Sequence, residues 1–293
     1  MLIISTLAVK NKFFTALSQQ IELSVWLTPN KIPSDEKTIS SMTAQYLEKN
    51  DTVLIISKYG NRTPADFPKI CLNNFLVSVV YYQSHGDILK WITAIKQYQN
   101  HSPRQVLVLG MLKPFYVKWA NKIYNSLKIS KYTEDKITRH LPDVTTNIEL
   151  AEKLSSGCLM AIYVGHGRSR GWSGYRGFRW NHVVRFIQKQ PIGSMISLSC
   201  SSLSQDKEES VPLGIKWVMD GRNCVFLGSI AAVKIKPLEE ITNIMLEVIT
   251  SVEVQRMDQL IFKMNDKIEQ LNNPEINLIW SSFRLVGNPI QAI

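Results

Sequence analysis

Short apolar runs recur along the chain, and most of them break at a glycine or a polar residue. The runs that predict buried β-strands lie at 53–56, 75–82, 106–110, 159–164, 195–198, 224–228 and 283–286. Between them lie segments in which apolar residues recur every three or four positions, as in amphipathic helices, beginning near residues 86, 116, 145, 211, 241 and 257. Strands that alternate with helices predict an α/β fold, in which a mostly parallel sheet is covered on both faces.

The first hundred residues carry weaker signals than the rest. They include a strand-like run at 21–27 and a polar, helix-like segment ending near Leu47. The tetrapeptide Asn100-His101-Ser102-Pro103 resembles a linker, and a chain of 293 residues suits either one large domain or two lobes. We therefore predict a small N-terminal α/β lobe over residues 1–100 and a larger domain over residues 101–293.

Composition favours a soluble protein of a reducing compartment. The chain is 45% hydrophobic, which supports a sizeable core, and its four cysteines fit no zinc spacing and suggest no disulfide framework. The apolar N-terminus is short and lacks the basic region of a secretion signal. No window approaches the roughly 18 apolar residues that a membrane span needs. We expect a cytoplasmic location without membrane contact.

The positive charge is concentrated in one part of the chain. The formal net charge is +10, and no Asp or Glu occurs between Glu152 and Asp206. The same window contains Lys153, Arg168, Arg170, Arg176, Arg179, Arg185 and Lys189. This distribution favours acidic partners near the window.

Two of the predicted strands end within that window, and each is followed by a loop that contains a residue able to take part in catalysis. The run 159–164 breaks at Gly165-His166-Gly167, and the run 195–198 breaks at Ser199-Cys200-Ser201. In α/β sheets, functional groups gather at the carboxyl ends of the strands. His166 and Cys200 are therefore a candidate base and nucleophile.

Other interpretations of this stretch are weaker. A nucleotide site would need a helix directly after the glycines of 165–171, whereas the sequence continues as a loop. A metal site built from His166, Cys200 and either His182 or Cys158 lacks a short-spaced ligand pair and a local carboxylate to orient a ligating histidine. Nucleic-acid binding stays open, because arginines alternate with aromatic residues at Arg168, Arg170, Trp172, Tyr175, Arg176, Arg179 and Trp180.

Nucleophilic catalysis fits the residues better. Cationic surroundings without carboxylates favour the reactive thiolate. The glycines beside His166 allow a substrate to approach the backbone, and the amides of Gly167 and Cys200 are candidate donors of an oxyanion hole. By contrast, a lone cysteine is most often a small buried hydrophobe, which is the interpretation we give Cys71, Cys158 and Cys224.

Several motifs together resemble the caspase-fold cysteine peptidases of clan CD, above all the gingipain-type (C25) and CHAT-domain branches. The motifs are Tyr163-Val164-Gly165-His166-Gly167, Gly171-Trp172, Ile196-Ser197-Leu198-Ser199-Cys200-Ser201, the segments 210–214 and 221–229, and the closing segment 283–289. The sequence departs from the family pattern at Ser199, where Ala is common, and at Asn288, where Asp is common. The chain lacks the Gln-Ala-Cys signature of animal caspases.

The resemblance implies a caspase-like three-layer sandwich and a cysteine endopeptidase that cleaves protein substrates without a metal or cofactor. Gingipains are secreted, whereas the N-terminus here lacks a secretion signal, so we expect an intracellular relative. His166 would be the catalytic imidazole, Cys200 the nucleophile, and Gly167 an oxyanion donor together with Cys200. Substrate contacts would come from Arg168, Arg170, Trp172, Arg176 and Arg179. A regulatory protein partner and a role in bacterial antiviral defence or signalling are further expectations.

Three points stay open at this stage. The group that orients His166 is Asp143, Glu149 or a backbone carbonyl. The arginine-rich loop favours an acidic P1 residue, whereas a basic P1 would need Asp143, Asp206 or Glu208. The alternative to a peptidase is a catalytically silent caspase-fold module that binds a protein or a nucleic acid through its basic face.

Overall fold

A computed structural model describes residues 1–5, 25–27, 36–43, 46, 51–60, 63–67, 69–72, 75–101, 103–130, 132, 136–205 and 211–293. The strands are β1 (Leu2–Ser5), β2 (Val25–Leu27), β3 (Asp51–Lys58), β4 (Cys71–Leu72), β5 (Phe75–Tyr82), β6 (Val106–Gly110), β7 (Ile137–His140), β8 (Cys158–Val164), β9 (Gly167–Arg168), β10 (Gly171–Trp172), β11 (Phe178–Arg179), β12 (Ile192–Leu198), β13 (Asn223–Ser229) and β14 (Phe283–Gly287). The helices are α2 (Glu36–Thr43), η1 (Pro64–Asp66), α3 (His85–His101), α4 (Pro114–Ile129), α5 (Asn147–Ser155), α6 (Trp180–Val183), α7 (Leu213–Met219), α8 (Ile235–Ile249), α9 (Met257–Gln270) and α10 (Pro274–Trp280).

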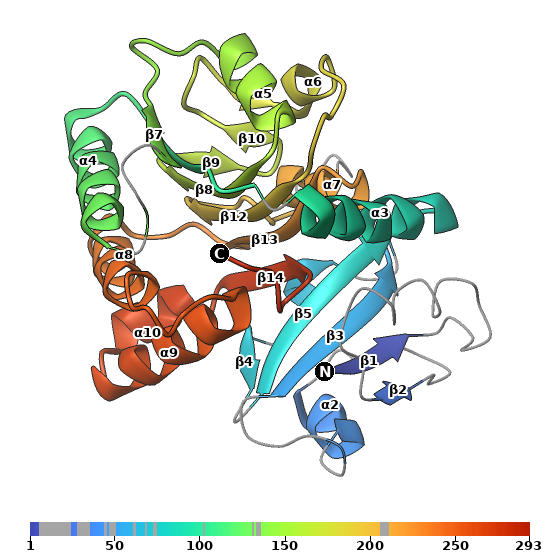
Figure 1. The fold of residues 1–293 in the computed structure, drawn as a ribbon. Helices are drawn as coiled ribbons and strands as arrows, with labels where there is room; N and C mark the ends of the chain where they lie inside the picture. The colour runs from blue at the N-terminus through green and yellow to red at the C-terminus, as the bar shows by residue number, and fades with distance from the viewer. Residues whose placement is uncertain are drawn as a thin grey trace.

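One large sheet runs through the molecule (Figure 1). Its strand order is β2-β1-β3-β5-β14-β13-β12-β8-β6-β7, with β4 beside β5. Neighbouring strands are parallel except for the pairs β13–β14 and β4–β5. Within the described residues, no helix is long and apolar enough to cross a membrane.

Helices cover both faces of this sheet. One apolar cluster joins the sheet to α3, α5, α6 and α7, and a second joins its other face to α4, α8, α9 and α10. Strand β8 contributes to both, because Tyr163 belongs to the first cluster while Ile162 and Val164 belong to the second. A strand buried on both faces is apolar at consecutive positions, which explains its continuous run in the sequence. The predicted three-layer α/β sandwich with a mostly parallel sheet is confirmed.

The segments 1–100 and 101–293 contribute strands to the same sheet. Strand β5 lies beside β14, and the Ser78 hydroxyl donates a hydrogen bond of 2.7 Å to the Gly287 carbonyl. Helix α3 packs on β13, where the Trp91 indole N–H donates to the Cys224 carbonyl at 3.0 Å. The predicted boundary near residue 100 coincides with the end of α3.

The structure differs from the sequence-based expectation after His166. We expected residues 171–177 to form a loop, whereas β9, β10 and β11 form a small antiparallel sheet there. Strands of two residues are too short to show an alternating pattern, so the sequence carries no signal for them. Strand β7, which lies at one edge of the large sheet, is likewise absent from the predicted buried strands. The expectations for residues 21–24, Leu47, Asp206 and Glu208 lie outside the described residues.

Candidate active site

The register of two parallel strands places His166 and Cys200 at the same edge of the sheet. Leu198 of β12 pairs with Val164 of β8, and each candidate catalytic residue lies two positions beyond its strand. Gly167 packs directly on the cysteine loop, because a Cβ atom there would fall inside van der Waals distance of the Ser199 hydroxyl and the Cys200 carbonyl. The structure therefore brings the His166 and Cys200 loops into contact, and only glycine at position 167 permits that approach.

The neighbours of the His166 ring come from the start of helix α4, where Lys113 is the N-cap residue and Tyr116 lies in the first turn. The Lys113 ammonium lies 3.4 Å from Nε2, and the Tyr116 hydroxyl lies 3.3 Å from Nδ1. An ammonium group can only donate, so Nε2 accepts from Lys113 and the ring proton of the neutral imidazole lies on Nδ1, facing Tyr116. Burial, the positive charge of Lys113 and then that of Arg168 lower the pKa of His166. The charged imidazolium is therefore disfavoured in the resting protein.

The backbone of His166 is also held firmly. The Tyr163 hydroxyl donates to the His166 carbonyl at 3.0 Å, and the Ser173 amide donates to the same carbonyl at 2.9 Å. Gly165 packs so closely on Tyr163 and Met111 that a Cβ atom there would overlap both. The histidine loop is therefore fixed by its own strand, by β6 and by the small sheet that follows.

The His166 ring contacts Lys113 and Tyr116, which differ from the orienting groups that we expected. The Glu149 carboxylate accepts from the Thr146 amide at 2.7 Å and completes the capping box of α5. The Asp143 side chain is exposed. Sequence reasoning missed Lys113 and Tyr116, although β6 lies next to β8 and the loop after β6 must reach the same edge of the sheet.

Cys200 lies in a turn that is tied to the loop after β13. The Val233 amide donates to Sγ at 3.4 Å, and the amide of Ser201 donates to the Ala231 carbonyl at 2.9 Å. Ser201 has a left-handed backbone conformation, with φ of 49°, which turns the chain sharply behind the cysteine. The thiol in turn donates to the Val233 carbonyl at 3.7 Å, so both backbone polar groups of Val233 contact Sγ.

The other three cysteines differ from Cys200 in their surroundings. Cys158 and Cys224 are fully buried, and burial raises the pKa of both thiols. Burial, followed by the negative charges of Glu269 and Asp266, raises the pKa of Cys71 to about 12. All four carry free thiols, and both Cys71 and Cys200 are partly exposed. Thiolate chemistry at neutral pH is thus disfavoured at the three cysteines that we interpreted as structural.

The side chain of Trp172, a residue of β10, packs on the inner face of the small sheet. Its ring is stacked on Tyr163 with the centroids 4.2 Å apart, and its side chain is 2% exposed. The indole N–H donates to the Ser197 hydroxyl at 3.1 Å, and the hydroxyls of Ser197 and Ser199 are 2.8 Å apart. These hydrogen bonds connect Trp172, through Ser197, to Ser199, the residue before Cys200. Ser199 is the position at which the sequence departs from the family pattern.

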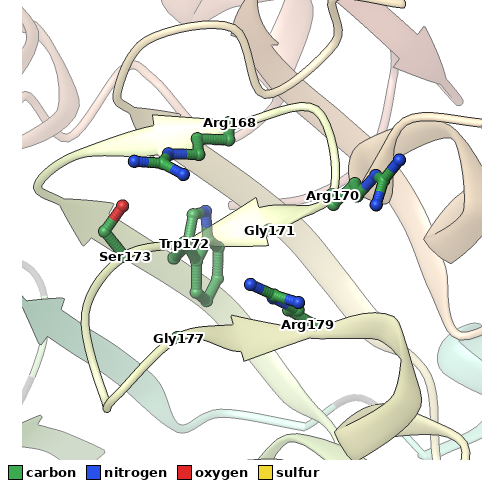
Figure 2. Close-up of a pocket in the computed structure, with 7 residues that line it drawn as sticks. All are labelled: Arg168, Arg170, Gly171, Trp172, Ser173, Gly177 and Arg179. Atoms are coloured by element: carbon green, nitrogen blue, oxygen red, sulfur yellow. The ribbon is translucent and has the colours of Figure 1, made fainter. Parts of the chain in front are cut away.

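A hollow of about 390 Å³ opens on the outer side of the small sheet. It is lined by Arg168, Arg170, Gly171, Trp172, Ser173, Gly177 and Arg179 (Figure 2). Four of the five predicted substrate-contacting residues are therefore brought together. Arg176 lies at the exposed tip of the β10–β11 turn, where it and Tyr175 have positive φ values of 58° and 55°.

The surroundings of His166 are unsuited to a metal ion. An ammonium group beside Nε2 opposes a second cation there. Among the residues that the structure describes, no three His, Cys, Asp or Glu side chains are grouped as a metal site would need.

Comparison with known proteins relates this site to a family. The sequence model of peptidase family C25 matches residues 71–292. No curated protein matches the chain. Because the family match covers more than half of the sequence, it establishes membership.

Solved structures share the fold at low sequence identity. The Arg specific cysteine proteinase gingipain R has a TM-score of 0.79 and 15% identity, over 100% of this chain and 78% of that chain. The complex of Porphyromonas gingivalis RgpB pro- and mature domains has a TM-score of 0.78 and 14% identity, over 100% of this chain and 80% of that chain. The Saccharomyces cerevisiae separase-securin complex has a TM-score of 0.55 and 14% identity, over 82% of this chain and 16% of that chain. The chain therefore belongs to peptidase family C25 and is a cysteine peptidase with a gingipain-like fold.

Proposed function

We propose that the protein is an endopeptidase in which Cys200 and His166 form a catalytic dyad. The observation that carries this proposal is the parallel register of β8 and β12, which places both residues equally far beyond their strands, with Gly167 packed on Cys200. In the proposed reaction, Nε2 of His166 exchanges its contact with Lys113 for the proton of the Cys200 thiol, and the sulfur attacks the scissile carbonyl. The proton then passes from His166 to the leaving amine, and water hydrolyses the resulting thioester.

The environment of His166 suits this proton transfer. Its lowered pKa keeps the imidazole neutral and able to accept a proton at neutral pH. The same positive neighbours make the imidazolium a stronger acid, which favours donation of the proton to the amine. The amides of Gly167 and Cys200 are the proposed donors to the oxyanion, since the two loops touch at these residues. Tyr116 and Lys113 are the proposed positioning residues.

The specificity of gingipain R for arginine is not carried over to this protein. A basic P1 side chain needs a carboxylate in its pocket, whereas the described residues that line the hollow beside the site include three arginines and no acidic residue. The two residues that sequence analysis proposed for a basic pocket from the following loop, Asp206 and Glu208, lie outside the described residues.

We also propose that a protein partner controls the activity, inside the reducing environment of the cytoplasm. The solved relatives include a complex with a pro-domain and a complex with securin, which supports regulation by a bound protein. Four free thiols agree with a reducing compartment. A role in antiviral defence or signalling, and membership of the CHAT branch, stay predictions from the resemblance.

The test compares the reactivity of two cysteines in the full chain. Wild-type protein is treated with an iodoacetamide probe, and labelling at each site is followed by mass spectrometry. We expect Cys200 to react faster than Cys71, His166→Ala to slow the reaction at Cys200, and Cys200→Ala to abolish peptide cleavage. The matched control Cys71→Ser should retain cleavage, because Cys71 lies on β4, a strand beside β5 and far along the sheet from β12.

The rival function is a silent binding module that uses the arginine-rich face. It would be supported if Cys200 reacted no faster than a simple thiol and His166→Ala changed nothing. Rapid labelling of Cys200 that depends on His166 would exclude that alternative, because a binding surface has no need of an activated thiol.

A further inference from the structure

Two arginines share one row on the outer face of the small sheet. Gly171 of β10 pairs with Arg168 of β9 on one side and with Arg179 of β11 on the other. Residues directly opposite one another on neighbouring strands point to the same face of a sheet. Both arginine side chains are exposed. The two guanidinium groups therefore extend from the same face, separated by a residue that has no side chain.

The glycine between them is required by the structure. Gly171 has a φ of 152°, and a Cβ atom there would collide with the Phe178 carbonyl. Figure 2 shows Arg168 and Arg179 on either side of β10, with Gly171 and Trp172 between them. The row thus forms a hollow with a glycine at its centre and a positive charge at each side.

The opposite face of the same sheet is anchored in the core. The next row consists of Gly167, Trp172 and Phe178, of which Trp172 is 2% and Phe178 0% exposed. Phe178 stacks on Trp172 with the ring centroids 5.3 Å apart. Because these inner residues are tightly packed, the backbone of the arginine row is held in place before any ligand binds, which lowers the entropic cost of recognition.

The row begins next to the catalytic histidine. Arg168 follows Gly167 directly, and its positive charge contributes to the lowered pKa of His166. Ser173 lines the hollow, and its amide binds the His166 carbonyl. An adjoining hollow shares Arg170 and Arg179 and is extended by Lys216. Arg168 and Ser173 thus connect the hollow to the His166 loop, which contacts the Cys200 loop through Gly167.

We infer that Arg168 and Arg179 form a clamp that selects substrates with Asp or Glu next to the scissile bond. This inference rests on the proposed peptidase function and names its substrate class. A guanidinium group offers paired N–H donors that match the two oxygens of a carboxylate. A lysine or arginine in the same position would meet two like charges in a hollow whose described lining residues include no acid.

The first experiment measures cleavage by the full chain. Quenched fluorescent peptides of one sequence carry Asp, Glu, Asn, Gln or Arg at each position near the bond that is cut. We expect kcat/KM to be highest with an acidic residue at one position beside that bond, by on the order of 10- to 100-fold over the matching amide, as for a hydrogen bond to a charged group. Equal cleavage of acid and amide, or a preference for Arg, would overturn the clamp while leaving the peptidase function intact.

Variants then locate the clamp. Arg179→Gln should remove most of the preference for acid over amide, whereas Arg185→Gln, an exposed arginine outside both hollows, should keep it. Arg176 lies in the turn before β11 and outside the row, so Arg176→Gln should reduce the preference for acid over amide much less than Arg179→Gln does. Equal losses at Arg176 and Arg179 would show general attraction by charge and would reject the clamp. Arg168→Gln is a secondary variant, since Arg168 also acts on His166.

A binding measurement separates failure of the clamp from failure of the catalytic proposal. Cys200→Ala protein is titrated with the same labelled peptides by fluorescence polarisation at low and high salt. We expect the acidic peptide to bind more tightly than its amide counterpart, with a difference that shrinks in salt and is lost in Arg179→Gln. An absence of any acid preference in binding rejects the clamp. Acid-selective binding without cleavage by the wild type would reject the peptidase proposal alone.

Discussion

At the scale of single residues, the ring of His166 lies beside a positive charge and a phenol, where we expected Asp143, Glu149 or a backbone carbonyl. Lys113 and Arg168 both act against the protonated form of His166, and Tyr116 contacts the other ring nitrogen. The protonation of His166, the proposed base, is consequently suppressed, and its ring contacts a phenol. The pH dependence of the peptidase should report this arrangement directly.

We predict that Lys113→Gln moves the acid limb of kcat/KM to higher pH. The Lys113 charge lowers the pKa of His166, so its removal raises that pKa towards the ordinary value, and more acidic solutions then protonate the base. The pH profile of cleavage, with an NMR titration of the His166 ring, provides the measurement. Lys113→Arg keeps the charge and should leave the limb nearly in place. A limb that moves to lower pH in Lys113→Gln would contradict the assignment of His166 as the base.

At the scale of elements, the small sheet is fixed to the large one through its turn. Tyr175 occupies a left-handed position yet is only 1% exposed. Its hydroxyl donates to the His140 carbonyl at 2.6 Å and accepts from the Gly110 amide at 3.1 Å. The turn between β10 and β11 is thereby attached to the ends of β6 and β7, and this attachment compensates for the unfavourable backbone.

We predict that Tyr175→Phe lowers the free energy of unfolding by about 1–3 kcal/mol, because it leaves a buried amide and a partly buried carbonyl without their partner. Cleavage should fall as well, since the arginine row and the His166 loop share this sheet. Urea unfolding and kcat/KM provide the two readouts. Tyr124→Phe, on the partly exposed face of α4, is a matched control that should change stability little. Unchanged stability in Tyr175→Phe would show that the turn is stable without the hydrogen bonds of the Tyr175 hydroxyl.

The elements differ in how well the sequence predicts them. Strands such as β8 and β12 are buried on both faces, so each appears in the sequence as a continuous apolar run followed by polar residues. The candidates His166 and Cys200 follow from that pattern. The contacts of Lys113 and Tyr116 with His166 depend on which strand lies next to β8, which a single sequence does not specify. Likewise, the arginine row depends on a register between two-residue strands. Trp172, which we expected to contact substrate, has a buried side chain because the same small sheet directs it into the core.

At the scale of the whole molecule, residues 1–100 and 101–293 share a sheet and a core. Trp91 of α3 is fully buried and binds the Cys224 carbonyl, so the helix that ends at the predicted boundary is packed on the later part of the chain. The salt bridge between Lys90 and Asp220, 2.8 Å long, spans the same contact. This arrangement predicts joint unfolding of the two segments.

We predict a single unfolding transition in urea, with the same midpoint by far-UV circular dichroism and by tryptophan fluorescence. Trp91→Phe should lower that midpoint, because it removes a buried hydrogen bond and leaves a void, at a cost of about 1–3 kcal/mol. Trp280→Phe, which alters the opposite face of the sheet, should shift the same transition. Two separated transitions, of which Trp91→Phe moved only one, would instead favour independent lobes.

The position of β14 gives the fold an order of assembly. This strand follows all the others in sequence, yet it lies between β5 and β13 in the sheet. The hydrogen bond from Ser78 to Gly287 closes a loop of 209 residues, and contacts so distant along the chain form late. As the ribosome releases the chain from its N-terminus, the strands that carry His166 and Cys200 emerge before the strand that joins them to the first segment. A nascent chain should therefore complete the central sheet only after synthesis has passed β14.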